Sequence, residues 1–186
     1  MGFRNILGVV ATTLLAATAA PPASAQSAAP AHVLPTITRT VLITADIQRL
    51  KRFYVDVFGF TATYDGVVGG DRFGPMLSKA WHLAPGAKLY GVVLHSPRGD
   101  TELGLTSAQG QTLRTLTRPT EVAPMSGNHY LIIQVPNLDA ALARLAPYKS
   151  KFSRKPMKLV DAEGKATYEA AFYDPDGTLI IAVEDH

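Results

Sequence analysis

The sequence predicts an α+β fold made of two halves with the same order of elements, β-α-β-β-β. Three observations predict it. A strand-like segment leads into a helix N-cap residue at Asp46 and again at Asn137, 91 residues later. An apolar stripe at helical spacing follows each cap. Strand-like segments then follow each helix, and the last two flank the tight turn Asp174-Pro175-Asp176-Gly177, in which proline and glycine favour the turn backbone.

The first half opens with a strand over residues 36–44, which are rich in β-branched side chains. The helix after Asp46 carries the apolar stripe Ile47, Leu50, Tyr54, Val57 and Phe58. Gly59 is expected to end this helix. Further strands are expected at residues 60–64, 88–95 and 101–106. The glycine-rich insertion at 66–87 is expected to hold a short helix near 76–82 and is a candidate lid over a pocket.

The second half repeats this order. A strand is expected at residues 129–135, and the helix after Asn137 is expected to stop at Pro147. Its apolar stripe consists of Leu138, Ala141, Leu142 and Leu145. The remaining strands are expected at residues 158–160, 167–173 and 178–183.

The N-terminus has the parts of a cleavable secretion signal. Arg4 precedes an apolar run over residues 6–20, and Ala23-Ser24-Ala25 supplies a small-residue cleavage site. The run is shorter than the roughly 20 residues that span a bilayer, so a membrane anchor is the weaker alternative. We therefore expect a signal peptide at residues 1–25, a flexible leader at 26–35 and one domain at 36–186. The processed protein is expected to be periplasmic or secreted, without a membrane partner.

Composition excludes several classes of protein. The chain has no cysteine, which rules out disulfides, thiolate nucleophiles and cysteine-based metal sites. Its formal charge is +3, and its densest basic cluster is Lys149, Lys151, Arg154, Lys155 and Lys158. The cluster lacks the interleaved aromatic residues of a nucleic-acid surface, so we interpret it as a solvated face and expect no nucleic-acid partner.

Two motifs resemble those of the vicinal oxygen chelate superfamily, which includes glyoxalase I, bleomycin-resistance proteins and extradiol dioxygenases. One runs from Thr40-Val41-Leu42-Ile43-Thr44-Ala45-Asp46-Ile47 into residues 53–60, and the other is Ala171-Phe172-Tyr173-Asp174-Pro175-Asp176-Gly177-Thr178. The resemblance covers residues 36–185. It implies two βαβββ modules, about 36–107 and 128–186, that form an open cup-shaped mixed sheet with the helices on its convex side. Metal and substrate would lie in the concavity.

The ligand positions of that superfamily are substituted in this chain. The first position, seven residues before the cap, falls on Arg39, and its counterpart in the second half falls on Tyr130. The position four residues after the turn glycine falls on Ile181, and the remaining one falls on Glu102 or Leu103. Arginine and isoleucine offer a divalent cation no lone pair, so we expect no metal at these positions. A shifted site that uses His95, Glu102, His129 or Glu169 is the alternative.

These positions predict a binding function without a cofactor. The candidate ligand-binding residues are Arg39, Glu102, Tyr130, Gln134 and Ile181, on an apolar wall suited to a small, partly apolar molecule. Arg39 would meet an anionic group or pair with Glu102, and replacing it with alanine is expected to weaken an anionic ligand. One alternative is a lyase, isomerase or dioxygenase that uses a shifted metal or acid–base chemistry from Glu102 and Tyr130. A second alternative is an assembly subunit with a filled cup. Homodimer formation is left open.

Overall fold

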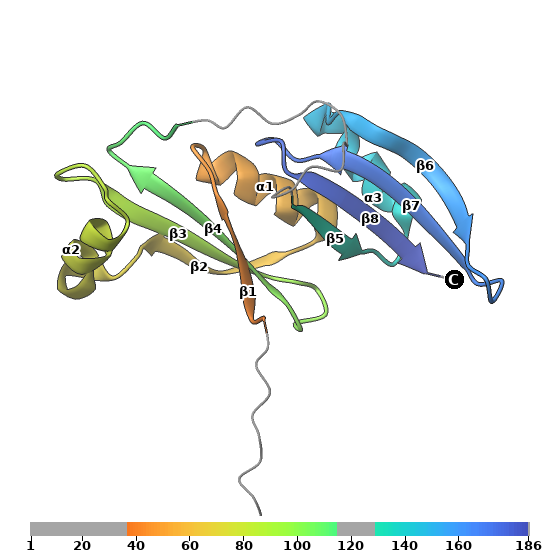
Figure 1. Cartoon of the computed structure of the whole chain (residues 1–186), viewed down its shortest axis with the longest axis horizontal. Helices are drawn as coiled ribbons and strands as arrows, with labels where there is room; N and C mark the ends of the chain where they lie inside the picture. Colours follow the sequence, from red (N-terminus) through yellow and green to blue (C-terminus); the bar gives the residue numbers. More distant parts are fainter. Residues whose placement is uncertain (1–36, 115–128, 186) are drawn as a thin grey trace, which may run out of the picture. The chain divides into compact units, whose positions relative to one another are not determined.

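The computed structural model describes residues 37–114 and 129–185, and these carry the expected order of strands and helices (Figure 1). In chain order the elements are β1 (Arg39–Ile43), α1 (Ile47–Phe58), β2 (Thr61–Val67), α2 (Gly70–Ala80), β3 (Lys88–His95), β4 (Glu102–Gln109), β5 (Tyr130–Gln134), α3 (Leu138–Leu145), the 3-10 turn η1 (Ala146–Tyr148), β6 (Phe152–Val160), β7 (Ala166–Tyr173) and β8 (Leu179–Asp185).

The strands form two four-stranded sheets with the same topology. Their orders are β1-β4-β3-β2 and β5-β8-β7-β6. The first strand of each module pairs in parallel with the last one, and the other pairs are antiparallel. Neither sheet closes on itself, and β1, β2, β5 and β6 are edge strands. The predicted fold class, α+β with two βαβββ modules and open mixed sheets, is confirmed.

The predicted helix ends are formed as their residues dictate. The Asp46 carboxylate accepts a hydrogen bond from the Arg49 amide at 3.0 Å, and the Asn137 side chain accepts one from the Ala140 amide at 2.7 Å. Each bond satisfies a free N–H group of the first helical turn. At the other end of α1, Gly59 has a φ of 74°, a left-handed conformation that glycine adopts at low cost.

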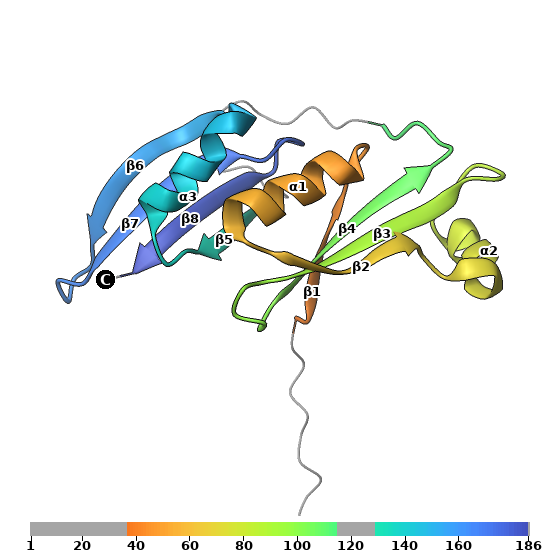
Figure 2. The ribbon, with the colours of Figure 1, turned by 180° about the vertical axis from the view of Figure 1, so that it is seen from behind.

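Helices α1 and α3 cover their own sheets and also pack against each other. Figure 2, turned from Figure 1, shows each helix on one face of its sheet. The buried side chains of both modules join in one core. The Phe58 ring at the end of α1 stacks on Phe172 of β7, with ring centroids 6.3 Å apart. Because α1 packs against a strand of the second module, the two modules share their hydrophobic core.

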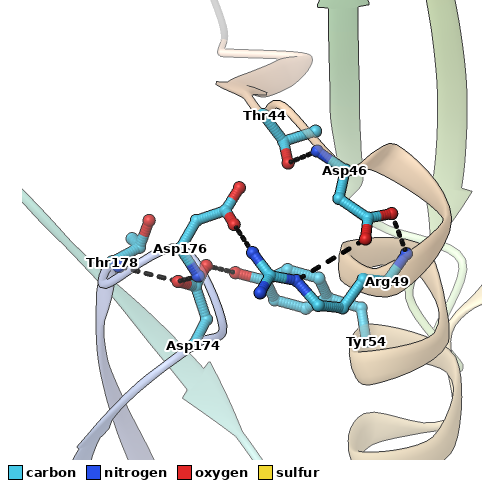
Figure 3. Close-up of polar contacts among 7 residues, drawn as sticks. All are labelled: Thr44, Asp46, Arg49, Tyr54, Asp174, Asp176 and Thr178. Atoms are coloured by element: carbon cyan, nitrogen blue, oxygen red, sulfur yellow. Dashed lines mark hydrogen bonds and ion pairs between the residues drawn. The ribbon is translucent and has the colours of Figure 1, made fainter. Parts of the chain in front are cut away.

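A polar network also joins the modules (Figure 3). Asp174, in the turn before β8, is 4% exposed. One of its oxygens accepts from the amides of Asp176 and Thr178, and the other accepts from the Tyr54 hydroxyl on α1 at 3.0 Å. Next to it, the Arg49 guanidinium donates to Asp176 at 2.6 Å. Burial raises the pKa of Asp174, against the smaller opposite effect of these hydrogen bonds.

The insertion differs from its prediction. The expected short helix near 76–82 is the longer α2, which begins at Gly70 and contains Pro75. No residue of α2 is buried, and Phe73 and Met76 are more than half exposed. Helix α2 packs on β3, and no residue of the insertion lines the cleft described below. The expectation that the insertion forms a lid over that cleft is therefore wrong.

Strand β6 is longer than predicted. It covers the nine residues Phe152–Val160, whereas the sequence indicated a strand only at 158–160. The sequence did not indicate the first part of this strand because that part contains Arg154, Lys155 and Pro156. Charged residues and proline are unusual in a central strand. They are tolerated here because β6 is the edge of its sheet, where charge and proline discourage pairing with another chain.

The predicted signal peptide and leader, residues 1–25 and 26–35, lie outside the described residues. Among the described helices, none has the length and apolar character needed to cross a membrane.

Candidate ligand-binding cleft

Alternating burial along three strands shows which side chains face away from the helices. On β1, Leu42 is buried in the core, whereas Arg39 is exposed. On β5, Tyr130 is 54% exposed. On β8, the two residues that flank Ile181 are fully buried, and Ile181 itself is half-buried. Because side chains alternate along a strand, Arg39, Tyr130 and Ile181 lie on the sheet faces opposite the helices, as the strand pattern predicted.

Arg39, Glu102 and His95 form a charged cluster on this face of the first sheet. Strand register places Arg39 opposite Glu102 and Glu102 opposite His95. The Arg39 Nε donates to one oxygen of Glu102 at 2.7 Å, and a second guanidinium nitrogen contacts the same oxygen. The His95 Nε2 lies 2.7 Å from the other oxygen. Leu103, the alternative to Glu102 at this position, is buried in the core.

This pairing determines the chemistry of Glu102. The hydrogen bond from Arg39 is the main cause that lowers the pKa of the Glu102 carboxyl, and His95 adds to it. Glu102 is therefore ionised at neutral pH, and both of its oxygens already have partners. Its carboxylate is a weak base, because a general base works best with a pKa close to the working pH.

A cleft of about 740 Å³ lies where the second module meets the first. Its walls come from the start of β4, the turn between β3 and β4, the end of α1 and both faces of the edge strand β5. It is lined by Thr40, Phe58, Phe60, Ser96, Pro97, Arg98, Asp100, Thr101, Glu102, Leu103, Tyr130, Leu131, Ile132, Ile133, Gln134, Val135, Pro136 and Arg144. About half of these lining residues are apolar, and the other half are polar or charged.

Two arginines on the cleft are held by neutral acceptors. The Arg98 guanidinium, from the β3–β4 turn, donates to Gln134 Oε1 at 2.7 Å. The Arg144 Nε, from α3, donates to the carbonyl oxygen of Val57 at 2.9 Å. Both bonds join the first module to the second, so they fix the two guanidinium groups on the walls of the cleft.

The structure brings together three of the five predicted site residues. Glu102, Tyr130 and Gln134 all line the cleft. Arg39 and Ile181 do not: Arg39 reaches the cleft only through its ion pair with Glu102. The sequence missed Arg98 and Arg144. Arg98 was visible only as part of a turn, and nothing along the chain indicated that packing of the modules would bring it to Gln134.

The residues present do not fit the metal site that the superfamily implies. The three positions opposite the helices carry a guanidinium, a phenol and an alkyl group, which together offer no ordinary ligand set for a divalent cation. In residues 37–114 and 129–185, no three histidine, aspartate or glutamate side chains are placed so that they could hold a metal ion. His95 and Glu102 are neighbours, but a catalytic centre normally has about three protein ligands.

A family model matches residues 36–181, and its description is Glyoxalase/Bleomycin resistance protein/Dioxygenase superfamily. The match covers most of the chain and includes both modules. The chain therefore belongs to the glyoxalase/bleomycin resistance protein/dioxygenase superfamily. No curated protein sequence matches it.

Solved structures agree with this assignment at the level of the fold. The chain is similar to a glyoxalase family protein from Bacillus cereus, with a TM-score of 0.64 and 14% identity over 85% of this chain and 99% of that one. It is also similar to a glyoxylase/bleomycin resistance protein/dioxygenase domain from Frankia sp. EAN1pec, with a TM-score of 0.56 and 17% identity over 82% and 99% of the two chains. A glyoxalase I mutant from Zea mays gives a TM-score of 0.51 and 20% identity over 79% and 46%.

Proposed function

We propose that this protein binds a small, partly apolar molecule in the cleft between its modules, without a metal, and that it does so outside the cytoplasm. The observation that carries the proposal is the cleft itself. Its volume of about 740 Å³ falls in the range of small-molecule sites, roughly 300–1,000 Å³. Its lining combines apolar side chains with polar groups that can orient a ligand, as small-molecule sites do.

The wall offers different contacts to the two ends of a ligand. Pro97, Ile132 and Pro136 provide exposed apolar surface for its body. Tyr130 and Gln134 lie on the exposed face of the edge strand β5 and provide hydrogen-bonding groups. Ile132 is 64% exposed, so a bound molecule would remove apolar surface from water, which favours binding by roughly 25 cal/mol per Å².

The alternatives receive less support. An acid–base enzyme that uses Glu102 and Tyr130 would need a base of adequate strength, and the lowered pKa of Glu102 argues against it. A non-catalytic assembly subunit with a filled cup would have no cleft of this size. Homodimer formation is compatible with the proposal.

Binding of an uncharged fluorescent probe, phenylnaphthylamine, tests the proposal. We expect saturable binding at one site per chain with a micromolar Kd. Ile132→Glu places a charge on the apolar wall and is expected to raise the Kd at least about tenfold, since an unpaired charge close to a bound apolar group costs more than 1.4 kcal/mol.

Val160→Glu is the matched control. Val160 is a β-branched residue of β6 with 58% exposure, similar to Ile132, but it does not line the cleft. It should leave the Kd unchanged within about twofold, an RT ln 2 effect of roughly 0.4 kcal/mol. Equal Kd values for both variants and the parent protein would show that the probe binds elsewhere and would overturn the proposal.

A further inference from the structure

Some charged side chains of the cleft have an oppositely charged partner, and others do not. Four charged side chains line it: Arg98, Arg144, Asp100 and Glu102. The question for ligand selectivity is which of these charges already has an opposite charge beside it. A charge without one remains available to a ligand, whereas a charge in an ion pair is largely cancelled.

The Glu102 carboxylate is already neutralised. It forms an ion pair with Arg39 and contacts His95 through its second oxygen. The Arg39 guanidinium pairs with Glu102 but does not itself line the cleft. A positively charged ligand would therefore have to compete with two groups that already hold Glu102.

The arginines are in a different situation. Arg98 and Arg144 donate to an amide oxygen and a backbone carbonyl oxygen, both neutral. Neither forms an ion pair with a carboxylate among the described residues. Each guanidinium has five N–H donors, and the hydrogen bonds above use one donor of each.

Asp100 offsets only part of this positive charge. Its carboxylate accepts from the hydroxyl groups of Ser96 and Thr101, and the Ser96 hydrogen bond is the main cause that lowers its pKa. Arg98 contributes to this lowering as a nearby charge. If Arg39, the ion-pair partner of Glu102, is included, the cleft has three positively charged guanidinium groups and two negatively charged carboxylates.

We infer that the cleft selects an organic anion, a molecule with an apolar body and one carboxylate, sulfonate or phosphate group, and that Arg98 and Arg144 bind this group. The inference rests on the proposed function, because it concerns the same cleft. The apolar body lies against the exposed apolar wall around Ile132, and the anionic group meets guanidinium donors, whose hydrogen bonds to anions are stronger than neutral ones.

A pair of probes that differ in one charged group tests the inference. Anilinonaphthalene sulfonate is phenylnaphthylamine with an added sulfonate group. We expect the protein to bind the sulfonate probe more tightly. Arg98→Gln should raise the Kd of the sulfonate probe by about threefold to tenfold, the range of a partly solvated charged hydrogen bond. The Kd of the uncharged probe should change by less than the Kd of the sulfonate probe, because only the sulfonate loses a charged partner.

Three further variants strengthen the test. Asp100→Asn keeps an acceptor for Ser96 but removes the negative charge, so it should lower the Kd of the sulfonate probe, the opposite direction to Arg98→Gln. Arg72→Gln, on α2 and outside the cleft, is the control and should change neither Kd. Arg144→Gln also loses the hydrogen bond to the Val57 carbonyl oxygen, so the thermal unfolding of this variant is measured alongside its binding. If Arg144→Gln unfolds, Arg98→Gln still tests the inference.

The outcomes separate the two proposals. If both probes bind at the Ile132 site with equal affinity and Arg98→Gln changes neither, the anion inference is wrong and the binding function stands. If neither probe binds at the Ile132 site, the binding function itself is wrong. Competition with naphthoate and naphthyl phosphate then identifies the anionic group: stronger displacement by one assigns the cleft to carboxylates or to phosphates.

Discussion

Glu102 shows how one neighbour sets the chemistry of a side chain. The residue was a candidate for both binding and acid–base catalysis. In the structure Arg39 and His95 each hold one of its oxygens, which makes the carboxylate a positioned, neutralised charge. Arg39, expected to meet a ligand or to pair with an acid, is paired.

Replacing Arg39 with alanine tests this pairing. Loss of the guanidinium removes the main cause that lowers the pKa of Glu102, so this pKa should rise toward the ordinary value for glutamate. Binding of anilinonaphthalene sulfonate should also weaken, because the Glu102 charge at the cleft is no longer cancelled. A carbon-detected NMR titration of the Glu102 carboxyl measures the pKa, with Arg72→Ala as the control. An unchanged pKa would mean that the ion pair does not form in solution.

The elements followed their local signals where those signals were complete. Asp46, Gly59 and Asn137 formed the expected helix ends, since caps depend on hydrogen bonds within one turn. The largest shortfalls were in α2 and β6, which were predicted four and six residues too short. In α2 the adjacent Gly74 and Pro75 looked like a break, and the charged residues of β6 looked like a loop.

Asp46→Ala measures what one cap contributes. The variant loses the hydrogen bond to the Arg49 amide and should lower the free energy of unfolding by about 1 kcal/mol. Asp46→Asn keeps a side-chain oxygen and should cost only a few tenths of a kcal/mol, because the 4.0 Å ion pair with Arg49 is exposed. Urea unfolding followed by circular dichroism compares the two. Equal losses would attribute the effect to charge rather than to the cap.

At the scale of the whole molecule, the modules are joined by a shared core and by the network around Asp174. Phe58 stacks on Phe172, and the Tyr54 hydroxyl donates to the buried Asp174. Both contacts run from α1 to the second module. We therefore expect the described domain to unfold as one unit, with its pH dependence shaped in part by this buried carboxyl.

Asp174→Asn tests that dependence. Burial raises the pKa of Asp174 in the folded protein, so the folded state binds this proton more tightly than the unfolded state does. The resulting stabilisation is complete below the unfolded pKa, about 3.9, and is lost as the pH rises through the folded pKa. The parent protein should therefore lose stability relative to the variant between about pH 4 and neutrality.

Free energies of unfolding measured for both proteins across this pH range check the prediction. Asparagine can still accept from the amides of Asp176 and Thr178, so the turn should be retained. Asp71→Asn, at an exposed carboxylate on α2, is the control. A difference between parent and Asp174→Asn that does not change with pH would contradict the raised pKa.

By itself, the sequence determined the two βαβββ modules, both ends of α1 and the start of α3, the turn before β8 and the faces of Arg39, Tyr130 and Ile181. These depend on spacing and on contacts close along the chain, which a sequence displays directly. Only the tertiary structure decided that Arg39 pairs with Glu102 and that Arg98 and Arg144 reach the cleft at β5. Arg98 and Gln134 are 36 residues apart, and Arg144 and Val57 are 87 apart. Such pairs meet only when the modules pack, and packing depends on how the whole core fills.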